Sequence, residues 1–382
     1  MFIEIMNRKL RIGIDARPLF VEKKTGIEVY LTNLLRELRE VDTQNEYLLF
    51  THKIDSKNIV ESNNFKYITV NGPNFAWPQL SLARYLKKNQ DDIDVCLFTH
   101  HSIPLRSPVK TVAVILDLAF IDYKEYFPYF SYLLNTKLTT NFTVKKADHL
   151  VAISQQTKKD ILTHYQVDEK KIDVIYLGFN SKKYHPRGSV EISSVLNKYH
   201  IKNDYVLYVG TMQKRKNLIN LLKAFAVVKK SKPSMQMVFA GKKGWFFEEI
   251  QETVRKEKLV DSVMFLGYVP ENDLPALYSG SKVFALVSLY EGFGIPLLEA
   301  MACGCPVITS NISSLPEVAG DAGVLIHNPH DYEEIAKKLI HVLSDQKLLS
   351  EMSKKSLSRA KEFSWKKCAA ETLNTLTHVA NS

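Results

Sequence analysis

The sequence predicts an α/β protein made of two doubly wound, Rossmann-like domains that face a central cleft. Its 382 residues are too many for one ordinary core and suit two. Short β-branched runs alternate with longer amphipathic segments along the whole chain, as in parallel sheets with crossover helices. A polar stretch interrupts this alternation after Tyr176, which indicates a domain boundary.

The first half of the chain contains six short apolar runs that predict strands. They occupy residues 11–14, 47–50, 67–70, 95–98, 112–116 and 150–153. Residues 27–39 and 154–164 show helical periodicity, and Ser154 is expected to cap the second of these helices.

A second series of strands is expected after a linker around residues 180–200. These strands occupy residues 205–209, 237–240, 263–266, 283–286, 306–309 and 323–326. The predicted domains therefore cover residues 1–185 and 186–362, and residues 363–382 are predicted to form a last helix. Ligands of such folds bind at the carboxyl ends of the strands, so the loops that follow the strands carry the functional candidates.

Composition limits the protein to a few classes. With 45% hydrophobic and 24% charged residues the chain is globular, and the net charge of +10 favours an anionic partner. No nucleic-acid recognition module is present, so no nucleic acid is expected to bind. Residues 1–8 lack the apolar stretch of a secretory signal and no run reaches the length of a membrane span, which predicts a cytoplasmic protein.

The four cysteines are too few and too unevenly placed for a disulfide framework. They are Cys96, Cys303, Cys305 and Cys368. The pair at 303 and 305 has no second pair of ligands nearby, so packing rather than metal binding is expected for it.

A cationic loop follows the strand predicted at 205–209. Gly210 allows a tight turn, and Arg215 and Lys216 can neutralise a diphosphate just before a helix that begins at Leu218. Cations beside the positive end of a helix are unfavourable unless an anion binds there. The alternative is a solvated basic helix start, but this electrostatic misfit favours a phosphate site.

A second loop follows the strand predicted at 283–286 and reads EGFGIPLLEA from Glu291. Pro296 suits the first turn of a helix, and the glycines before it leave backbone N–H groups able to face an anion. Glu291 in the loop and Glu299 in the helix can border one pocket and accept hydrogen bonds from sugar hydroxyls. The alternative is an unrelated pair of loop and surface glutamates.

These residues resemble a known family. Glu291 and Glu299 reproduce the E-x7-E element of the retaining family 4 glycosyltransferases with the GT-B fold, and the surrounding SLYEGFGIPLLEAMACGCPVITSNISSLPEVAGDAG is also similar. The segments IDARPLF and TGIEVYLTNLLREL, then ADHLVAISQQTKKDI, then YVGTMQKRKNLINLLKAF resemble other family elements in the expected order. The resemblance implies an acceptor-binding domain over 1–185, a nucleotide-sugar-binding domain over 186–362, and a helix over 363–382 that packs back on the first domain.

The resemblance also implies a donor site. Its members are Gly26, Gly210, Thr211, Arg215, Lys216, Tyr268, Val269, Glu291, Gly292, Phe293, Gly294, Ile295 and Glu299. Glu299 would hold the ribose and Glu291 the transferred sugar, while amides of residues 293–295 would meet the sugar and the distal phosphate. Arg215 and Lys216 would hold the diphosphate. Tyr268 and Val269 would border the base, and Gly26 would approach the donor phosphates.

One position departs from the family. Members often carry His-Asp after the strand that corresponds to 112–116, and here the pair is Leu116-Asp117. Asp117 is expected to be a polar contact at the catalytic centre. His100 or His101, at the end of the preceding strand, could replace the missing histidine, although a loop histidine is more often solvated.

The implied mechanism is retaining and uses no cofactor. Arg215, Lys216 and the helix N-terminus would stabilise the charge that develops on the leaving nucleoside diphosphate, so Glu291 and Glu299 are not assigned the acid and base roles of a glycosidase. Asp92-Ile93-Asp94 has the D-x-D spelling of metal-dependent transferases but precedes its strand, at the wrong edge of the sheet. No catalytic metal is expected.

The similarity is greatest to bacterial mannosyl- and rhamnosyl-transferring members that build surface polysaccharides, which favours GDP-mannose as donor over a UDP-sugar. The acceptor would be a glycan or a lipid-linked glycan. Residues 123–146 mix aromatic residues with lysines. This segment would either lie on the acidic inner surface of a membrane or form a core helix with a solvated basic edge. A protein that binds nucleotide sugars without catalysis is the remaining alternative.

Overall fold

The computed structural model describes residues 8–21, 26–55, 58–73, 77–126, 139–245 and 247–382. The chain divides into two compact units. The first unit contains Met1–Leu177 and Trp365–Ser382, and the second contains Gly178–Ser364. These limits differ from the divisions at 185/186 and 362/363 that the sequence suggests.

The second unit begins earlier than the sequence suggests because the linker packs on it. The backbone N–H of Arg187 donates to Ser279 Oγ over 3.1 Å, and Lys183 pairs with Glu271 at 2.5 Å. The ring of Tyr184 meets the ring of Tyr278 edge-on, with 6.2 Å between their centroids.

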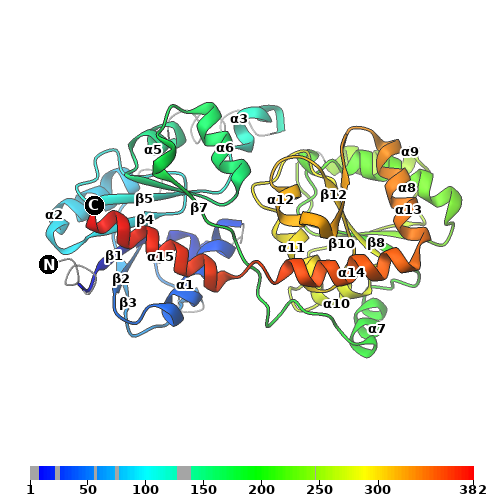
Figure 1. Ribbon diagram of the computed structural model, residues 1–382, viewed down its shortest axis with the longest axis horizontal. Coiled ribbons are helices and arrows are strands. Elements are labelled where there is room, and N and C mark those ends of the chain that lie inside the picture. The colour runs from blue at the N-terminus through cyan, green and yellow to red at the C-terminus, as the bar shows by residue number, and fades with distance from the viewer. Residues whose placement is uncertain (1–7, 22–25, 56–57, 74–76, 127–138, 246) are drawn as a thin grey trace. The chain divides into compact units, whose positions relative to one another are not determined.

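The first unit contains a seven-stranded parallel sheet of order β3-β2-β1-β4-β5-β6-β7 (Figure 1). The strands are β1 (Arg11–Asp15), β2 (Glu46–Thr51), β3 (Phe65–Thr69), β4 (Val95–Phe98), β5 (Lys110–Ile115), β6 (His149–Ala152) and β7 (Ile172–Val174). In register, Ile12 lies beside Tyr47 on one side and beside Val95 on the other. Strands β2, β4 and β6 are buried along their whole length, as expected for a parallel sheet covered on both faces.

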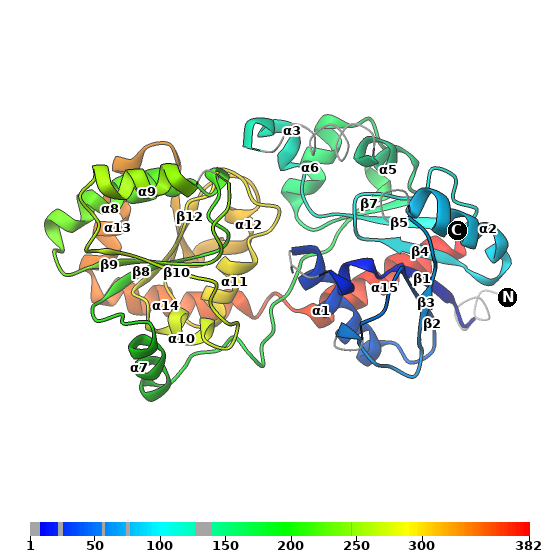
Figure 2. The ribbon, with the colours of Figure 1, turned by 180° about the vertical axis from the view of Figure 1, so that it is seen from behind.

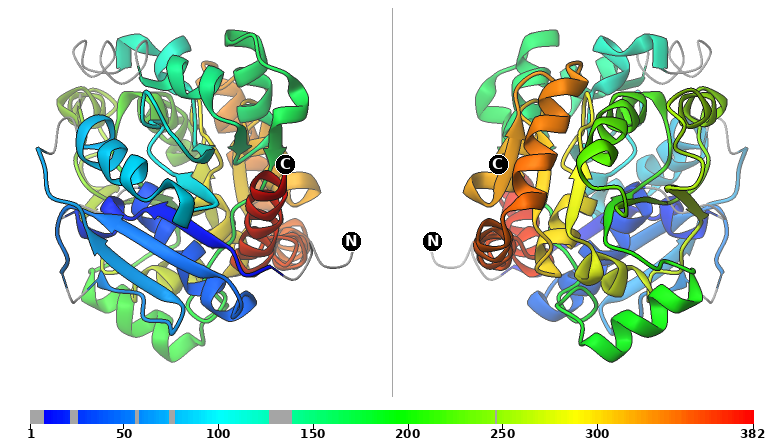
Figure 3. Two further views of the ribbon diagram at one scale, coloured as in Figure 1. Left: turned by 90° about the vertical axis from the view of Figure 1, so that its left-hand side faces the viewer. Right: turned by 90° about the vertical axis from the view of Figure 1, so that its right-hand side faces the viewer.

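The helices of the first unit are α1 (Gly26–Val41), α2 (Ala83–Lys88), α3 (Ala119–Asp122), α5 (Asn141–Lys146), α6 (Gln155–His164) and α15 (Trp365–Asn381). Ser154 caps α6 as predicted, because its hydroxyl accepts from Thr157 N. Alternate strand residues form a core with the helices on one face, and this core includes Phe50, Phe98, Ala113, Ile115, Leu86, Val144 and Ile161. The last helix, α15, lies along α1 and also contacts β4 and β5 (Figures 2 and 3).

The second unit contains a six-stranded parallel sheet of order β10-β9-β8-β11-β12-β13. The strands are β8 (Tyr205–Val209), β9 (Gln236–Ala240), β10 (Val263–Gly267), β11 (Val283–Leu286), β12 (Val307–Ser310) and β13 (Gly323–Ile326). The helices are α7 (Ser189–Lys198), α8 (Leu218–Ser231), α9 (Phe247–Lys256), α10 (Leu274–Gly280), α11 (Ile295–Ala302), α12 (Leu315–Ala319), α13 (Tyr332–Ser344) and α14 (Gln346–Ala360).

Each sheet reverses its strand order at one place. In the first unit the reversal lies between β1 and β4, and in the second it lies between β8 and β11. Loops diverge to opposite faces at such a reversal, which leaves a crevice at the carboxyl ends of the two strands. The fold therefore indicates one candidate crevice in each unit.

All twelve predicted strands are present, with ends shifted by at most two residues. The thirteenth, β7, was not predicted, because its three residues Ile172, Asp173 and Val174 form too short and too polar a run. Asp173 is tolerated there because its carboxylate accepts from Thr375 Oγ1 of α15 over 2.6 Å.

No helix among the described residues combines the length and the apolar character needed to cross a membrane. Residues 127–138 of the segment considered for membrane contact lie outside the described part of the chain. On either side of them the structure has a short turn at Lys124–Tyr126 and the helix α5.

The contact between α15 and α1 gives the first prediction. Trp365 is 4% exposed and meets the buried Tyr30 edge-on, with 6.0 Å between ring centroids. We expect Trp365→Ala to destabilise the first unit by about 3–5 kcal/mol, because removing a buried tryptophan leaves a cavity. Hydrogen exchange of α1 amides measures the change. Trp245→Ala is the matched control because Trp245 is 50% exposed, and equal effects of the two variants would contradict the packing.

Candidate active site

Two loops meet at the strand-order reversal of the second unit. The first follows β8 and contains Gly210 and a 3₁₀ turn at Lys214–Lys216. The second follows β11 and leads into α11. Because β8 and β11 are parallel neighbours, both loops leave the same edge of the sheet. The backbone N–H of Leu289 donates to the carbonyl of Arg215 over 2.9 Å and joins them.

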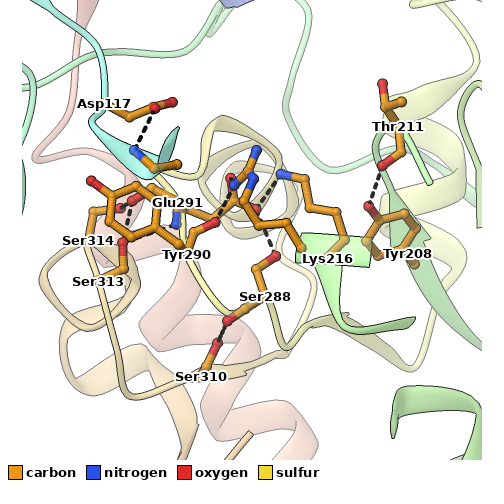
Figure 4. A network of polar contacts seen from close by, with 12 residues as sticks. Asp117, Tyr208, Thr211, Lys216, Ser288, Tyr290, Glu291, Ser310, Ser313 and Ser314 are labelled. Carbon is orange, nitrogen blue, oxygen red and sulfur yellow. Dashed lines mark hydrogen bonds and ion pairs between the residues drawn. The ribbon is translucent and has the colours of Figure 1, made fainter. Parts of the chain in front are cut away.

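Glu291 is the centre of the contacts between these loops. Lys216 Nζ lies 2.5 Å from one carboxylate oxygen and Arg215 Nη1 lies 3.4 Å from the other. Ser288 Oγ donates to the same carboxylate over 2.7 Å, and Figure 4 shows Lys216 and Ser288 directed toward Glu291. Arg215 also donates to the carbonyl of Tyr290. The three charged side chains are only 10–15% exposed, so their charges are poorly screened by water.

The charge state of this cluster follows from its contacts. Burial alone would raise the pKa of Glu291, but the positive charges of Lys216 and Arg215, with hydrogen bonds from Lys216 and Ser288, lower it to about 2. Glu291 is therefore ionised at neutral pH. Lys216, Arg215 and Glu291 together carry a formal charge of +1, which favours an anion nearby.

Hydroxyl groups hold the backbone of the second loop. Ser313 Oγ accepts from the N–H of Glu291 over 3.0 Å, and Ser314 Oγ donates to its carbonyl over 2.9 Å. Ser310 Oγ donates to the carbonyl of Ser288 over 2.5 Å (Figure 4). These serines lie at and just after β12, the next strand of the sheet, so β12 fixes the direction in which Glu291 points.

Two glycines allow the loops to approach their neighbours closely. Gly294 is the N-cap of α11 with φ of 97°, and a Cβ there would lie 2.9 Å from Leu315. Gly241, after β9, has φ of 145°, and a Cβ there would lie 2.0 Å from the carbonyl oxygen of Gly210. Any other residue at 241 would push the first loop away. Among the described residues no side chain caps α11, whose first turn contains Pro296.

Glu299 lies on α11 in surroundings unlike those of Glu291. Tyr278 Oη donates to its carboxylate over 3.2 Å. Burial raises the pKa of Glu299 to about 7, and hydrogen bonds from Tyr184 and Tyr278 only partly oppose this. The nearby negative charge of Glu271 raises the pKa further. Glu299 is therefore poised between its protonated and ionised forms near neutral pH.

The candidates for contact with a base follow β10. Tyr268 is 65% exposed, and Lys242 Nζ lies 5.4 Å from the centre of its ring. Val269 is buried. The carbonyl of Gly267 accepts from the N–H of Gly241 over 2.7 Å, which ties the loop after β10 to the loop after β9. An exposed aromatic face next to a lysine can stack on a planar, electron-rich ring.

The remaining candidates belong to the first unit. Gly26 is the first residue of α1 and is exposed. The carboxylate of Asp117 accepts from the N–H of Ala119 over 3.1 Å. His101 Nε2 accepts from the N–H of Leu116 over 3.0 Å, and burial lowers the pKa of His101 to about 4. His101 thus contacts the position that replaces the family's usual histidine.

The amino-acid sequence matches two protein-family models, one in each half of the chain. Residues 24–183 match the model described as Glycosyltransferase Family 4, and residues 193–359 match the model described as Glycosyl transferases group 1. The chain belongs to the family 4 glycosyltransferases.

Relatives within this family include transferases of surface polysaccharides. The chain is 35% identical over 234 residues to O-antigen chain mannosyltransferase B of Escherichia coli, a match that covers 61% of each chain. It is also 35% identical over 236 residues to O-antigen chain mannosyltransferase RfbU of Salmonella typhimurium, which covers 61% of this chain and 60% of that protein. The matched regions thus span about three fifths of these relatives.

Solved structures match over nearly the whole chain. Sucrose-phosphate synthase from Thermosynechococcus elongatus has a TM-score of 0.76 at 19% identity and covers 96% of this chain and 98% of its own. HepE from Anabaena, solved in complex with UDP-glucose, has a TM-score of 0.75 at 18% identity and covers 97% of this chain and 100% of its own. The two parallel-sheet units are those of the GT-B fold that the sequence predicts.

The structure of the family 4 chain brings only some of the predicted site residues into contact. Arg215, Lys216 and Glu291 form one cluster, whereas Glu299 bonds to tyrosines. The four serines around Glu291 were not predicted, although the run VSLYE after β11 and the run TSNISS, which begins within β12, are rich in hydroxyls. Asn217, the N-cap of α8, was not predicted either, and its amide donates to the carbonyls of Val287 and Pro329 over 3.0 and 2.6 Å.

The D-x-D sequence lies at the amino end of β4. Arg11 binds both of its carboxylates, donating to Asp92 from its guanidinium and to Asp94 from its backbone N–H, each over 2.7 Å. Within the described ranges no group of three histidine, cysteine, aspartate or glutamate side chains is placed to hold a metal ion.

The raised pKa of Glu299 gives the second prediction. In the folded chain Glu299 stays protonated from pH 4.5, its usual pKa, up to about pH 7, whereas in the unfolded chain it has lost this proton. The stability of the folded chain therefore falls as pH rises through that interval. Glu299→Gln removes the titration, so its melting temperature should decline less than that of the wild type between these pH values. Differential scanning fluorimetry measures this, with Glu351→Gln on the exposed side of α14 as control. Parallel curves for the wild type and the Glu299 variant would contradict the assignment.

Proposed function

We propose that the chain is a retaining, metal-independent glycosyltransferase that moves a hexose, mannose from GDP-mannose, to a glycan or lipid-linked acceptor in surface polysaccharide synthesis. The observation that carries the proposal is the buried cluster of Arg215, Lys216 and Glu291 at the strand-order reversal of the second unit. The two O-antigen mannosyltransferases among its relatives support the choice of mannose.

The cluster suits a diphosphate because its positive charge is already in place. Glu291 holds the side chains of Lys216 and Arg215 in place, so little reorganisation is needed when an anion arrives. The second loop adds the backbone N–H groups of Gly292, Phe293, Gly294 and Ile295, which precede or begin α11. Gly210 and Thr211 would line the same loop edge after β8.

The two glutamates would have different roles. Each carboxylate oxygen has two lone pairs, so Glu291 can accept a hydroxyl of the transferred sugar while it keeps Lys216. Glu299 would accept the ribose hydroxyls, with Tyr278 as the group that holds it in place. Tyr268 and Val269 would border the base.

The reaction needs no enzyme nucleophile. The bond between the anomeric carbon and the donor phosphate oxygen breaks, and its electron pair leaves with the nucleoside diphosphate. The acceptor hydroxyl forms the new bond from the same face and passes its proton to the departing phosphate oxygen, so configuration is retained. Arg215 and Lys216 stabilise the developing negative charge. The first unit would bind the acceptor, and Asp117 and Gly26 are its candidate residues.

A UDP-sugar is the second candidate donor, since a structural neighbour is solved with UDP-glucose. The exposed ring of Tyr268 can stack on either base. The remaining alternative is that the chain binds a nucleotide sugar without catalysis. It would then bind GDP or UDP but show no turnover. If the acceptor is lipid-linked, the chain would contact the inner face of a membrane, which flotation with acidic liposomes would detect.

The third prediction tests the cationic cluster by activity. Lys216→Ala should lower kcat for donor hydrolysis or transfer about 10²- to 10³-fold, as is typical when one group that stabilises transition-state charge is removed. Lys214→Ala in the same turn is the control, because Lys214 is 40% exposed and pairs with Glu249 at 3.5 Å. A panel of GDP- and UDP-sugars identifies the donor. Equal rates for both variants, or turnover abolished by EDTA and restored by manganese, would contradict the proposal.

A further inference from the structure

The linker that leads into the second unit brings a hydroxyl group to Glu299, the carboxylate assigned above to the ribose of the donor. Residues 178–188 belong to the second unit, and Tyr184 within them is 6% exposed. Its ring packs edge-on against Tyr278 of α10, with 6.2 Å between the ring centroids. Tyr184 and Tyr278 both form hydrogen bonds to the carboxylate of Glu299. The orientation of Glu299 therefore depends on a segment outside the loops at the strand ends.

Further contacts fix the linker on the second unit around Tyr184. Lys183 pairs with Glu271 at 2.5 Å, and the guanidinium of Arg187 donates to the carbonyl of Lys183 over 2.7 Å. The backbone N–H of Arg187 donates to Ser279 Oγ over 3.1 Å. Because these contacts lie on both sides of Tyr184, its hydroxyl is held next to Glu299 with little further loss of conformational entropy.

The titratable groups that face Glu299 come from the linker (Lys183 and Tyr184), from α10 and the turn before it (Tyr278 and Glu271), and from the end of α11 (Cys303). Burial raises the pKa of Glu299 to about 7, and the negative charge of Glu271 acts in the same direction. The hydrogen bonds from the two tyrosines and the positive charge of Lys183 oppose this. Burial raises the pKa of the Cys303 thiol and of both tyrosines, so these groups stay protonated. Two of the three groups that favour the ionised form of Glu299 thus belong to the linker.

The two forms of Glu299 differ in what they can bind. An ionised carboxylate only accepts hydrogen bonds, whereas a protonated one has an oxygen occupied by its own proton. The neighbouring hydroxyls of a ribose are donors, and hydrogen bonds from them to a charged acceptor are stronger than those to a neutral one. Glu299 is partly exposed, so a ligand can reach it while the tyrosines hold it. Affinity for the ribose is therefore expected to rise as Glu299 ionises.

We propose that Tyr184 is a positioning residue of the donor site, whose hydroxyl directs the carboxylate of Glu299 toward the ribose of a bound nucleotide. The inference rests on the proposed function, which assigns Glu299 to the ribose. Tyr184 acts through Glu299 and does not itself contact the nucleotide. Lys183 assists by pairing with Glu271, whose negative charge would otherwise repel the ionised carboxylate.

Binding of GDP to the full chain tests the proposal, measured by isothermal titration calorimetry from about pH 6 to about pH 8.5, with UDP measured in parallel. Tyr184→Phe removes one oxygen and keeps the ring against Tyr278. Because the lost hydrogen bond favoured the ionised carboxylate, the variant needs a higher pH to ionise Glu299. Its Kd should be about three- to tenfold above that of the wild type near pH 7, as expected for one hydrogen bond. The ratio should fall to within about twofold near pH 8.5, where Glu299 is ionised in both proteins.

Two controls separate a positioning role from a general effect on the fold. Tyr199→Phe removes a hydroxyl that donates to the carboxylate of Asp273 over 2.6 Å in the same unit. This variant should bind GDP as the wild type does at every pH. The second control is a ligand, 2′,3′-dideoxy-GDP, which lacks the hydroxyls assigned to Glu299. The wild type and Tyr184→Phe should bind it with equal affinity.

The outcomes distinguish this inference from the function on which it rests. A wild type that binds neither GDP nor UDP would contradict the proposed donor site, and the inference would fall with it. If the wild type binds, equal Kd values for it and Tyr184→Phe near pH 7 overturn the positioning role alone. A loss of affinity that is the same at every pH, or the same for the dideoxy ligand, also overturns it, because Tyr184 would then act only on the fold.

Discussion

The carboxylate of Glu291, buried between Lys216 and Arg215, is the constraint on which the proposed donor site depends. A buried charge needs an opposite charge and hydrogen bonds, and here these come from two loops that are 75 residues apart in sequence. The pairing is available only because β8 and β11 are neighbours in the sheet. It holds the two loops together, and the two cations keep Glu291 ionised throughout the neutral range.

The two glutamates of the E-x7-E element show how surroundings assign different chemistry to the same side chain. Glu291 faces two cations and has a pKa near 2, whereas Glu299 is buried against tyrosines and has a pKa near 7. The linker residue Tyr184 contributes to the second environment through its hydrogen bond to Glu299.

Most of the strands and most of the candidate site residues could be predicted from the sequence. Buried parallel strands leave strong apolar runs, and glycines, cations and glutamates follow these runs directly. Residues such as Lys216 and Glu291 were predicted to meet a donor, but not to bind each other. That contact depends on strand order, which local patterns do not encode. The bond of Tyr278 to Glu299 was beyond prediction for the same reason, whereas the strand Ile172–Val174 was missed because its run is too short and too polar.

A crystal structure of the chain with GDP-mannose bound would test the central claim most directly. The account predicts that the diphosphate contacts both Arg215 and Lys216, that Glu291 stays within hydrogen-bonding distance of Lys216, and that the first turn of α11 faces the distal phosphate. A diphosphate bound elsewhere, with the ion pairs of Glu291 unchanged and no contact to either cation, would contradict it.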